Sequence, residues 1–235
     1  MHAQVLHPWQ VTTHEAIAIQ RRLRGQVAME NMLGDIRLIA GADIATSKDS
    51  PKAYAGVVVL SYPALEVVEE RGLEDDVTFP YIPGLLAFRE GPLLIKVFEQ
   101  LNSNPDVIVF DGQGLAHPRG MGIATHMGLV FDKPTIGCAK SLLFGRYQEP
   151  DAEKGAWAEL RDSQGQVVGA ALRSKLKTSP IFVSIGHRVD LPTAIRILLD
   201  CTRGVRIPEP TRLADHFVTQ LRRGDGRRGD RSRQR

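Results

Sequence analysis

Three carboxylates lie at or near the ends of predicted structural elements, where they could bind a divalent cation. Asp43 belongs to the run Gly41–Ala45 in the first predicted strand, Asp111 follows the apolar run Val107–Phe110, and Glu90 lies in a predicted helix. An aspartate inside an apolar strand is costly unless it is paired or binds a cation. Mg²⁺ prefers oxygen ligands and usually takes one or two protein carboxylates, leaving positions for water and phosphate. The acids therefore suggest a site where a metal ion polarises a phosphoryl oxygen and activates water.

The segment after Asp111 suggests a close approach by a substrate. Residues 112–122 contain four glycines together with His117 and Arg119. Glycine lets the backbone approach a ligand closely, and the two basic side chains suit a phosphate-bearing substrate. The alternative is a glycine-rich turn that follows a core strand and leaves Asp111 in solvent.

The elements that must position these acids can be read from the apolar pattern. We expect strands over Ile36–Ile44, Tyr54–Ser61, Leu65–Leu73, Asp106–Asp111, Pro134–Ala139, Val167–Leu172 and Ile181–Ile185. We expect helices from Thr12 or Thr13 to about Asn31, and over Gly84–Leu101, Gly120–Phe131, Pro192–Cys201 and Thr211–Leu221. Pro92 should kink the second helix or mark its true start.

This order predicts an α/β fold with a mixed central sheet flanked by helices. The first three strands have short connections, which favours an antiparallel meander, and later strands alternate with helices. In such a sheet the first and fourth strands are plausible neighbours, so Asp43 and Asp111 can converge. No repeat and no flexible linker interrupts residues 1–221, which we predict to form a single domain.

Composition restricts the class of protein. The chain has 235 residues, of which 43% are hydrophobic and 24% charged, as in ordinary globular proteins. No apolar run is long enough for a transmembrane helix, and Met1–Thr13 does not resemble a signal peptide. Cys138 and Cys201 are the only cysteines and form no CxxC motif. We therefore expect free thiols, a cytoplasmic location and no structural zinc.

The basic charge of the chain is concentrated at its end. Residues 222–235 contain seven arginines and two aspartates, whereas the rest has 23 basic and 25 acidic residues, a net charge of −2. This tail has nothing apolar to bury, so we expect it to be disordered. It could add non-specific affinity for nucleic acid, or it could be a solvated tail without a function.

Several motifs taken together resemble the endonuclease V family. They occur in order, at matching separations, within residues 12–221, and are highly specific in combination. The motifs are Gly41-Ala42-Asp43, Pro80-Tyr81-Ile82-Pro83-Gly84, Phe88-Arg89-Glu90-Gly91-Pro92, Asp111-Gly112-Gln113-Gly114, His117-Pro118-Arg119 and the segment Lys133–Leu142. The resemblance implies a ribonuclease H-like fold, which agrees with the predicted strand order.

The resemblance also implies an activity and roles for individual residues. The family cuts DNA beside deaminated purines, chiefly deoxyinosine, at the second phosphodiester bond 3′ to the lesion, leaving 3′-hydroxyl and 5′-phosphate ends. It uses Mg²⁺, for which Mn²⁺ can substitute, and its precedent is monomeric. Asp43 and Asp111 match the metal ligands and Glu90 the catalytic glutamate. Lys140 matches a basic residue near the metal, and His216 matches a late catalytic histidine.

A loop and a pocket should recognise the lesion. In Pro80-Tyr81-Ile82-Pro83, two prolines restrict the backbone around two bulky residues, so the loop can enter a base stack. In the family this motif separates the strands, and Tyr81 would be its principal DNA contact. A flipped base needs a narrow pocket that closes on the edge where guanine carries its 2-amino group. The candidates for this pocket are Gly84, Leu85, Gly112, Gly122 and Ile123. For the Pro80–Pro83 loop, the alternative to a wedge is a loop packed against the protein's own core.

The remaining polar residues carry open alternatives. His117 and Arg119 could contact phosphate or support the structure, whereas His126 is expected to be structural and His7 to lie at the surface.

The motifs also leave other functions open. An enzyme that prefers inosine in RNA would share the same motifs. A non-catalytic nucleic-acid-binding module would be expected to lack part of the acid set, and a small-molecule phosphohydrolase would have no use for the wedge loop.

Overall fold

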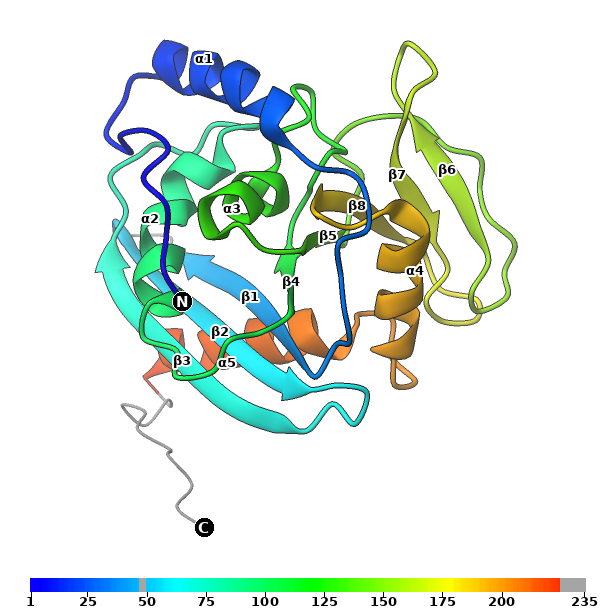
Figure 1. Cartoon of the computed structure of the whole chain (residues 1–235). Coiled ribbons are helices and arrows are strands. Elements are labelled where there is room, and N and C mark those ends of the chain that lie inside the picture. Colours follow the sequence, from blue (N-terminus) through cyan, green and yellow to red (C-terminus); the bar gives the residue numbers. More distant parts are fainter. Residues whose placement is uncertain (47–49, 225–235) are drawn as a thin grey trace.

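The computed structural model describes residues 1–46 and 50–224 and contains an eight-stranded mixed sheet (Figure 1). The sheet order is β3-β2-β1-β4-β5-β8-β7-β6. The strands are β1 (Leu38–Thr46), β2 (Lys52–Ser61), β3 (Val67–Asp76), β4 (Val107–Asp111), β5 (Thr135–Ala139), β6 (Trp157–Arg161), β7 (Val167–Leu172) and β8 (Ile181–His187). The helices are α1 (Thr13–Leu23), α2 (Leu86–Phe98), α3 (Ile123–Phe131), α4 (Leu191–Asp200) and α5 (Glu209–Arg223), with a 3-10 helix η1 (Arg24–Gln26) after α1.

The topology agrees with the predicted mixed sheet. β1, β2 and β3 form the expected antiparallel meander, and β1 pairs with β4 in parallel. β4 and β5 are also parallel, whereas β8, β7 and β6 continue the sheet with antiparallel pairing. The first and fourth strands are therefore neighbours, as the sequence predicts.

Helices cover both faces of the sheet, and strand alternation assigns each side chain to one face. Ile108 and Phe110 of β4 point into the core formed with α2 and α3. Val107 and Val109 of the same strand point to the opposite side, where α4 and α5 pack. α1 lies outside these layers and packs on the start of α2 through a smaller cluster that includes Ala16.

Local sequence signals explain where the helices begin and end. Thr12 and Glu15 form a capping box at the start of α1, as a Thr-x-x-Glu pattern predicts. The expected extension of this helix to Asn31 is wrong. α1 ends at Leu23 and is followed by η1, which contains Gly25, a poor helix former. Pro92 lies inside α2 without ending it, because the apolar face of that helix is buried on the sheet.

Two further expectations need correction. β6 is absent from the predicted strands because only Leu160 of its five residues is buried, which leaves no alternating apolar pattern. Arg222 and Arg223, predicted as part of the tail, belong to α5, which Gly224 caps in the left-handed conformation. The disorder predicted for residues 225–235 lies outside the described residues. Within the described chain, no helix combines the length and apolar character needed to cross a membrane.

Candidate active site

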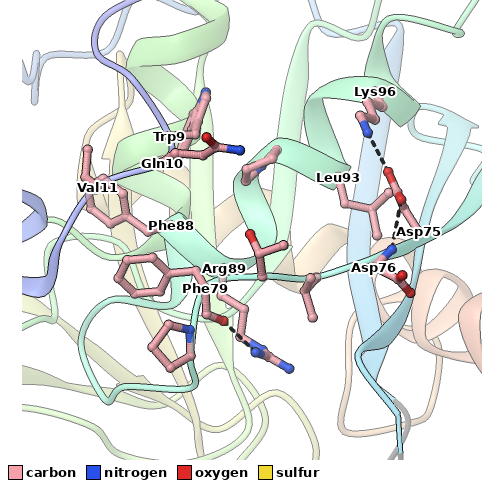
Figure 2. A pocket seen from close by; sticks show the side chains of 14 residues that line it. Trp9, Gln10, Val11, Asp75, Asp76, Phe79, Phe88, Arg89, Leu93 and Lys96 are labelled. Atoms are coloured by element: carbon pink, nitrogen blue, oxygen red, sulfur yellow. Dashed lines mark hydrogen bonds and ion pairs between the residues drawn. The ribbon is translucent and has the colours of Figure 1, made fainter.

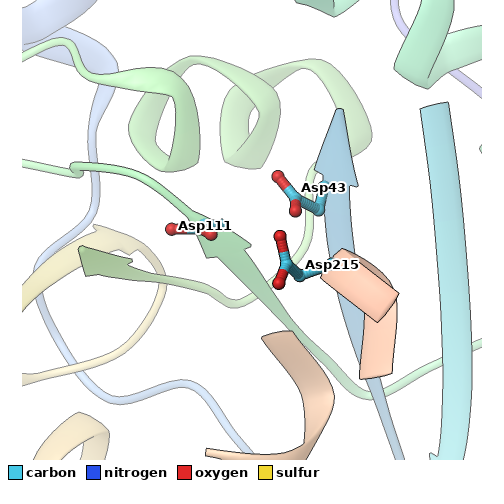
Figure 3. Close-up of side chains that lie close together, drawn as sticks. All are labelled: Asp43, Asp111 and Asp215. Carbon is cyan, nitrogen blue, oxygen red and sulfur yellow. The ribbon is translucent and has the colours of Figure 1, made fainter. Parts of the chain in front are cut away.

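Three carboxylates face one another near the carboxyl-terminal ends of the central strands β1 and β4 (Figure 3). Asp43 lies near the end of β1, Asp111 ends β4, and Asp215 lies two turns into α5. One oxygen from each side chain lies within 4.8 Å of the others. The predicted convergence of Asp43 and Asp111 is confirmed. Asp215 is missing from the sequence-based site because the resemblance implies a role only for its neighbour His216.

Strand register and one close backbone contact bring the three acids together. In the parallel pair β1–β4, Ala42 lies opposite Phe110, so the residues that follow them come side by side. Gly41 and Asp43 point to the same face of β1. A Cβ atom on Gly41 would lie 1.9 Å from the carbonyl oxygen of Pro210, so α5 starts directly against that glycine. Because α5 begins so close to β1, Asp215 of α5 lies beside Asp43 of β1.

Lys140 neutralises part of the acidic cluster. Its Nζ atom lies 2.7 Å from Asp111 Oδ2 and 3.6 Å from Asp215 Oδ1. Lys140 directly follows β5, the neighbour of β4, which explains why a residue so far along the chain reaches Asp111. This geometry places Lys140 beside the acids, where the resemblance implies a basic residue, and lets it restrain the Asp111 carboxylate.

The two acids nearest the core are hard to ionise in the absence of a cation. Burial, followed by the negative charge of Asp111, raises the pKa of Asp43 to about 8. Burial also raises the pKa of Glu90 to about 8, with a contribution from Asp43. Glu90 lies on α2, which packs on one face of the sheet, whereas Asp215 lies on α5, which packs on the opposite face. Crowded, partly desolvated carboxylates of this kind are typical of functional sites.

The donor set fits a divalent metal ion. Asp43, Asp111 and Asp215 each offer a carboxylate oxygen at mutual distances that one ion can bridge. Hard oxygen donors are the ligands that Mg²⁺ prefers. A bound cation favours the ionised carboxylates and removes the repulsion that raises the pKa of Asp43. His216 lies one residue further on, exposed, with Nε2 2.9 Å from Gln220 Nε2, and its catalytic role stays a prediction.

A cavity of about 340 Å³ opens beside Asp111. Four of the five predicted pocket residues line it: Gly84, Gly112, Gly122 and Ile123. Leu85 does not, because its side chain is buried in the cluster that joins α1 to α2. The lining also includes residues that the sequence analysis did not select, namely Leu86, Ala87, Gln113, Met121, Ala139, Ser141, Leu142 and Leu143.

Gly122 lines the cavity as predicted and also has a packing role within the loop. A Cβ atom at this position would lie 2.1 Å from the backbone oxygen of Gln113. The glycine is therefore required for close packing within the loop itself, before any ligand is considered. Enlarging Gly122 would displace the loop, so it would not report cleanly on recognition of a base.

The predicted wedge loop lies at the mouth of the cavity. Tyr81 is 71% exposed, whereas Ile82 packs on the buried cluster that includes Phe79 and Phe88. The backbone of Leu85 donates a hydrogen bond to Ile82, closing a turn below the tip. The loop thus has an anchored base and a free aromatic tip, and both Tyr81 and Pro83 line the cavity.

The carbonyl oxygen of Gly84 joins the wedge loop to the glycine-rich loop. It accepts hydrogen bonds from Gln20 Nε2 at 3.0 Å, His117 Nε2 at 2.9 Å and Arg119 Nη2 at 2.7 Å. Gly84 has φ +81°, which allows its carbonyl to meet all three donors. Gln20 is fully buried, and its amide also donates to Met121. Both walls of the cavity are therefore attached to α1.

His117 is part of this backbone network. Its ring is 3% exposed, and Nδ1 accepts hydrogen bonds from the backbone of Arg119 and Met121 while Nε2 donates to Gly84. Burial lowers its pKa to about 4, so the ring is neutral near pH 7. Of the two sequence-based alternatives, phosphate contact and structural support, this geometry favours structural support.

A larger groove of about 600 Å³ lies away from the acids, between the N-terminal segment and α2 (Figure 2). Trp9 and Phe88 lie on one side of it, while Lys96 pairs with Asp75 at the other end. Arg89 donates from Nη1 to the carbonyl oxygen of Phe79 at 2.6 Å. Pro80 reaches this groove, so the first proline of the wedge motif lines it, not the cavity beside Asp111.

His7, His126 and both cysteines are buried. His7 was expected at the surface, but it is buried and its Nε2 lies 2.6 Å from His126 Nε2. Trp9 stacks on His126, which explains the burial of His7 beside it. His126 is structural, as expected. Burial raises the pKa of Cys138 to about 12, so this thiol in the core is unreactive.

Comparison with known proteins identifies the family. The endonuclease V family model matches residues 21–216. This chain belongs to the endonuclease V family. It is 47% identical over 222 residues to the endonuclease V of Methanothrix thermoacetophila, covering 94% of this chain and 97% of that protein. The sequence-based resemblance is thus confirmed, and the chain is a nuclease of this family.

Solved structures of endonuclease V share the fold. The enzyme from Bacillus subtilis superposes with a TM-score of 0.90 at 32% identity, covering 96% of this chain and 98% of that one. The Ciona intestinalis enzyme, solved in complex with a 24mer DNA containing an inosine followed by a ribo-adenosine, gives a TM-score of 0.80 at 28% identity, with 91% and 98% covered. The predicted ribonuclease H-like fold is confirmed.

Proposed function

We propose that this endonuclease V is a DNA repair enzyme that nicks strands containing deaminated bases, chiefly deoxyinosine. The proposed cut is at the second phosphodiester bond 3′ to the lesion and leaves 3′-hydroxyl and 5′-phosphate ends. The observation that carries the proposal is the position of the acid cluster beside a cavity with a wedge loop at its mouth. This arrangement combines phosphodiester chemistry with space for one displaced nucleotide.

In this proposal Asp43, Asp111 and Asp215 hold Mg²⁺, or Mn²⁺ in its place. When bound, the ion polarises the scissile phosphoryl oxygen and favours ionisation of a water molecule. Lys140, 2.7 Å from Asp111, keeps that carboxylate in position and offers a positive charge to the phosphate. Glu90 and His216 are the proposed groups that handle protons around the reacting phosphate. The raised pKa of Glu90 suits a group that exchanges a proton near neutral pH.

Recognition is assigned to the wedge loop and the cavity. Tyr81 would fill the gap left by the flipped base, with Pro80, Ile82 and Pro83 supporting it and Arg119 contacting phosphate. The base would enter the cavity between Gly84 and Ile123. In this proposal the backbone there closes on the edge of the base where guanine carries its 2-amino group, and so rejects guanine. The enzyme would act as a monomer in the cytoplasm, and its two free, buried thiols support a reducing compartment.

A nicking assay tests the proposal. End-labelled duplexes that contain deoxyinosine, uracil or an abasic site, and an undamaged control duplex, are incubated with Mg²⁺ or with EDTA. We expect the inosine strand to be cut at the bond that directly follows the lesion's 3′ neighbour, and only when Mg²⁺ is present. Cleavage of undamaged duplex at the same rate, or cleavage in EDTA, would contradict the proposal.

Inosine in RNA is the second candidate substrate. The Ciona intestinalis relative was solved with DNA in which a ribo-adenosine follows the inosine. The same assay on matched ribo- and deoxyinosine strands decides between the two substrates. A non-catalytic binding module is a weaker candidate because the acid cluster is intact. A small-molecule phosphohydrolase would leave the exposed Tyr81 without a use.

A further inference from the structure

Three arginines gather where α1 meets the glycine-rich loop. Arg21 lies in the last turn of α1, Arg24 begins η1, and Arg119 lies in the loop that lines the cavity. A Cβ atom on Gly120 would lie 2.5 Å from Arg24 Nε, so that guanidinium rests on the loop. Burial, with the positive charge of Arg21 nearby, lowers the pKa of Arg119.

The positive charges of these arginines are not neutralised by the protein. Among the described residues, none of the three forms an ion pair with a carboxylate. Arg119 donates only to neutral groups, from Nε to Gln20 Oε1 at 2.5 Å and from Nη2 to Gly84. Arg24 has one weak contact, with the Met29 sulfur at 3.8 Å. Like charges brought together in this way repel unless an anion lies between them.

A structural explanation accounts for only part of this arrangement. Basic residues in the last turn of a helix interact favourably with its dipole, and Arg21 and Arg22 both lie there. Arg22, however, points elsewhere: its Nη2 donates to the carbonyl oxygen of Leu6 at 3.1 Å. The dipole therefore does not explain why Arg24 rests on Gly120 and why the charge of Arg21 lies near Arg119.

The arginine cluster lies at the rim of the cavity, which makes a phosphate of the bound strand the anion it would meet. Gln20, the residue before Arg21, is fully buried and bonded to Gly84, Met121 and Arg119, the first two of which belong to the cavity lining. The arginine cluster is thereby held in a fixed place at the rim of the cavity. If the cavity takes a flipped base, the arginine cluster lies close to the backbone of that strand.

We infer that Arg21, Arg24 and Arg119 form a binding site for backbone phosphates of the strand that carries the lesion. The inference rests on the proposed function, because it takes the cavity as the place of the flipped nucleotide. Guanidinium groups suit this role, since they pair with phosphate oxygens through two parallel hydrogen bonds and stay charged. α1 would thus be a nucleic-acid-binding element of the enzyme.

The salt dependence of DNA binding tests this inference. Affinity for an inosine duplex is measured in EDTA, where no cleavage is expected, between 50 and 200 mM salt. Each lost phosphate contact should reduce the slope of log K against log salt by about 0.9. We expect Arg21→Gln and Arg24→Gln each to reduce the slope by that amount, and the double variant by about twice as much. A double variant with the wild-type slope would overturn the inference.

Two controls separate charge from structure. Arg22→Gln removes the same charge from the same helix turn and should leave the slope unchanged. Arg24→Lys keeps the charge and should restore most of the slope even if packing on Gly120 changes. Equal loss of slope in Arg22→Gln and Arg21→Gln would point to a general charge effect and overturn the inference. Failure of the wild-type enzyme to nick inosine DNA would instead refute the proposed function.

Discussion

At the scale of single residues, the raised pKa of Asp43 has a consequence for the stability of the metal-free protein. Its pKa is raised from an ordinary value of 3.8 to about 8, chiefly by burial and then by Asp111. The folded state therefore holds a proton that the unfolded chain releases above about pH 4. It follows that this group destabilises the metal-free fold progressively as the pH rises from about 4 to about 8.

The first prediction concerns Asp43→Asn. In EDTA at pH 8 this variant should unfold at a higher temperature than the wild type, because the neutral amide avoids the cost of ionisation. A gain of ~1 kcal/mol would raise the melting temperature by ~2–4 °C at this chain length. The difference should vanish near pH 4, and nicking should be lost at every pH. Calorimetry at both pH values checks this, and a variant less stable than the wild type at pH 8 would contradict it.

The second prediction concerns two neighbours on α5. Asp215 faces Asp43 and Asp111, whereas the exposed His216 contacts Gln220. Asp215→Asn should reduce nicking by at least ~100-fold. Mutating residues that only hydrogen-bond to metal ligands already reduces metal affinity or activity by ~10–100-fold. His216→Asn should also lower nicking by ~100-fold or more, the usual contribution of a group that transfers a proton. Wild-type nicking by His216→Asn would leave Asp215 as the only functional residue of the pair.

At the scale of elements, the wedge loop has a free tip on an anchored base. The third prediction is that Tyr81→Ala weakens binding of an inosine duplex by roughly tenfold, since stacking of a base on an aromatic ring contributes ~1–3 kcal/mol. Its melting temperature should stay near the wild-type value because the side chain is 71% exposed. Ile82→Ala is the matched control, and it should lower stability because Ile82 packs on a buried cluster. Unchanged DNA affinity in Tyr81→Ala would remove the wedge role.

The contact of α5 with β1 depends on the absence of a side chain at Gly41. The fourth prediction is that Gly41→Ala destabilises the protein by ~1–3 kcal/mol, the usual cost of overpacking, and reduces nicking further by moving Asp215 from Asp43. Gly34→Ala is the control, because a Cβ atom there meets nothing within 4 Å. Urea unfolding and a nicking assay on both variants test this. Equal stability of the two variants would show that α5 can shift without cost.

Sequence patterns predicted most elements because their apolar positions are regular. β2 and β4 are examples, since each is buried along most of its length. β6 was missed because it is nearly all exposed, and α1 was predicted too long because its apolar spacing continues past Gly25. The site was predicted in part. Asp43 and Asp111 follow from neighbouring strands, but Asp215 comes from a helix at the end of the sequence, and its distance from them depends on packing at Gly41.

At the scale of the whole molecule, the acid cluster joins the first strand of the sheet to the last helix. Ion binding should therefore stabilise the entire fold, because it favours the native state over the unfolded chain. The fifth prediction is that saturating Mg²⁺ raises the melting temperature at pH 8, with ~2.7 kcal/mol of stabilisation at a concentration 100 times the dissociation constant. Asp111→Asn should lose most of this increase. An identical increase in that variant would place the ion elsewhere.

The position of Asp215 also has a consequence for the order of events during synthesis. A ribosome makes β1, β4 and the wedge loop long before it makes α5, so the growing chain carries two acids of the cluster without the third. Until α5 has emerged and packed on Gly41, the chain can form most of its sheet but lacks the complete set of ion-binding oxygens. Nuclease activity should therefore begin only when folding is nearly finished, so that nascent chains do not cut nucleic acid.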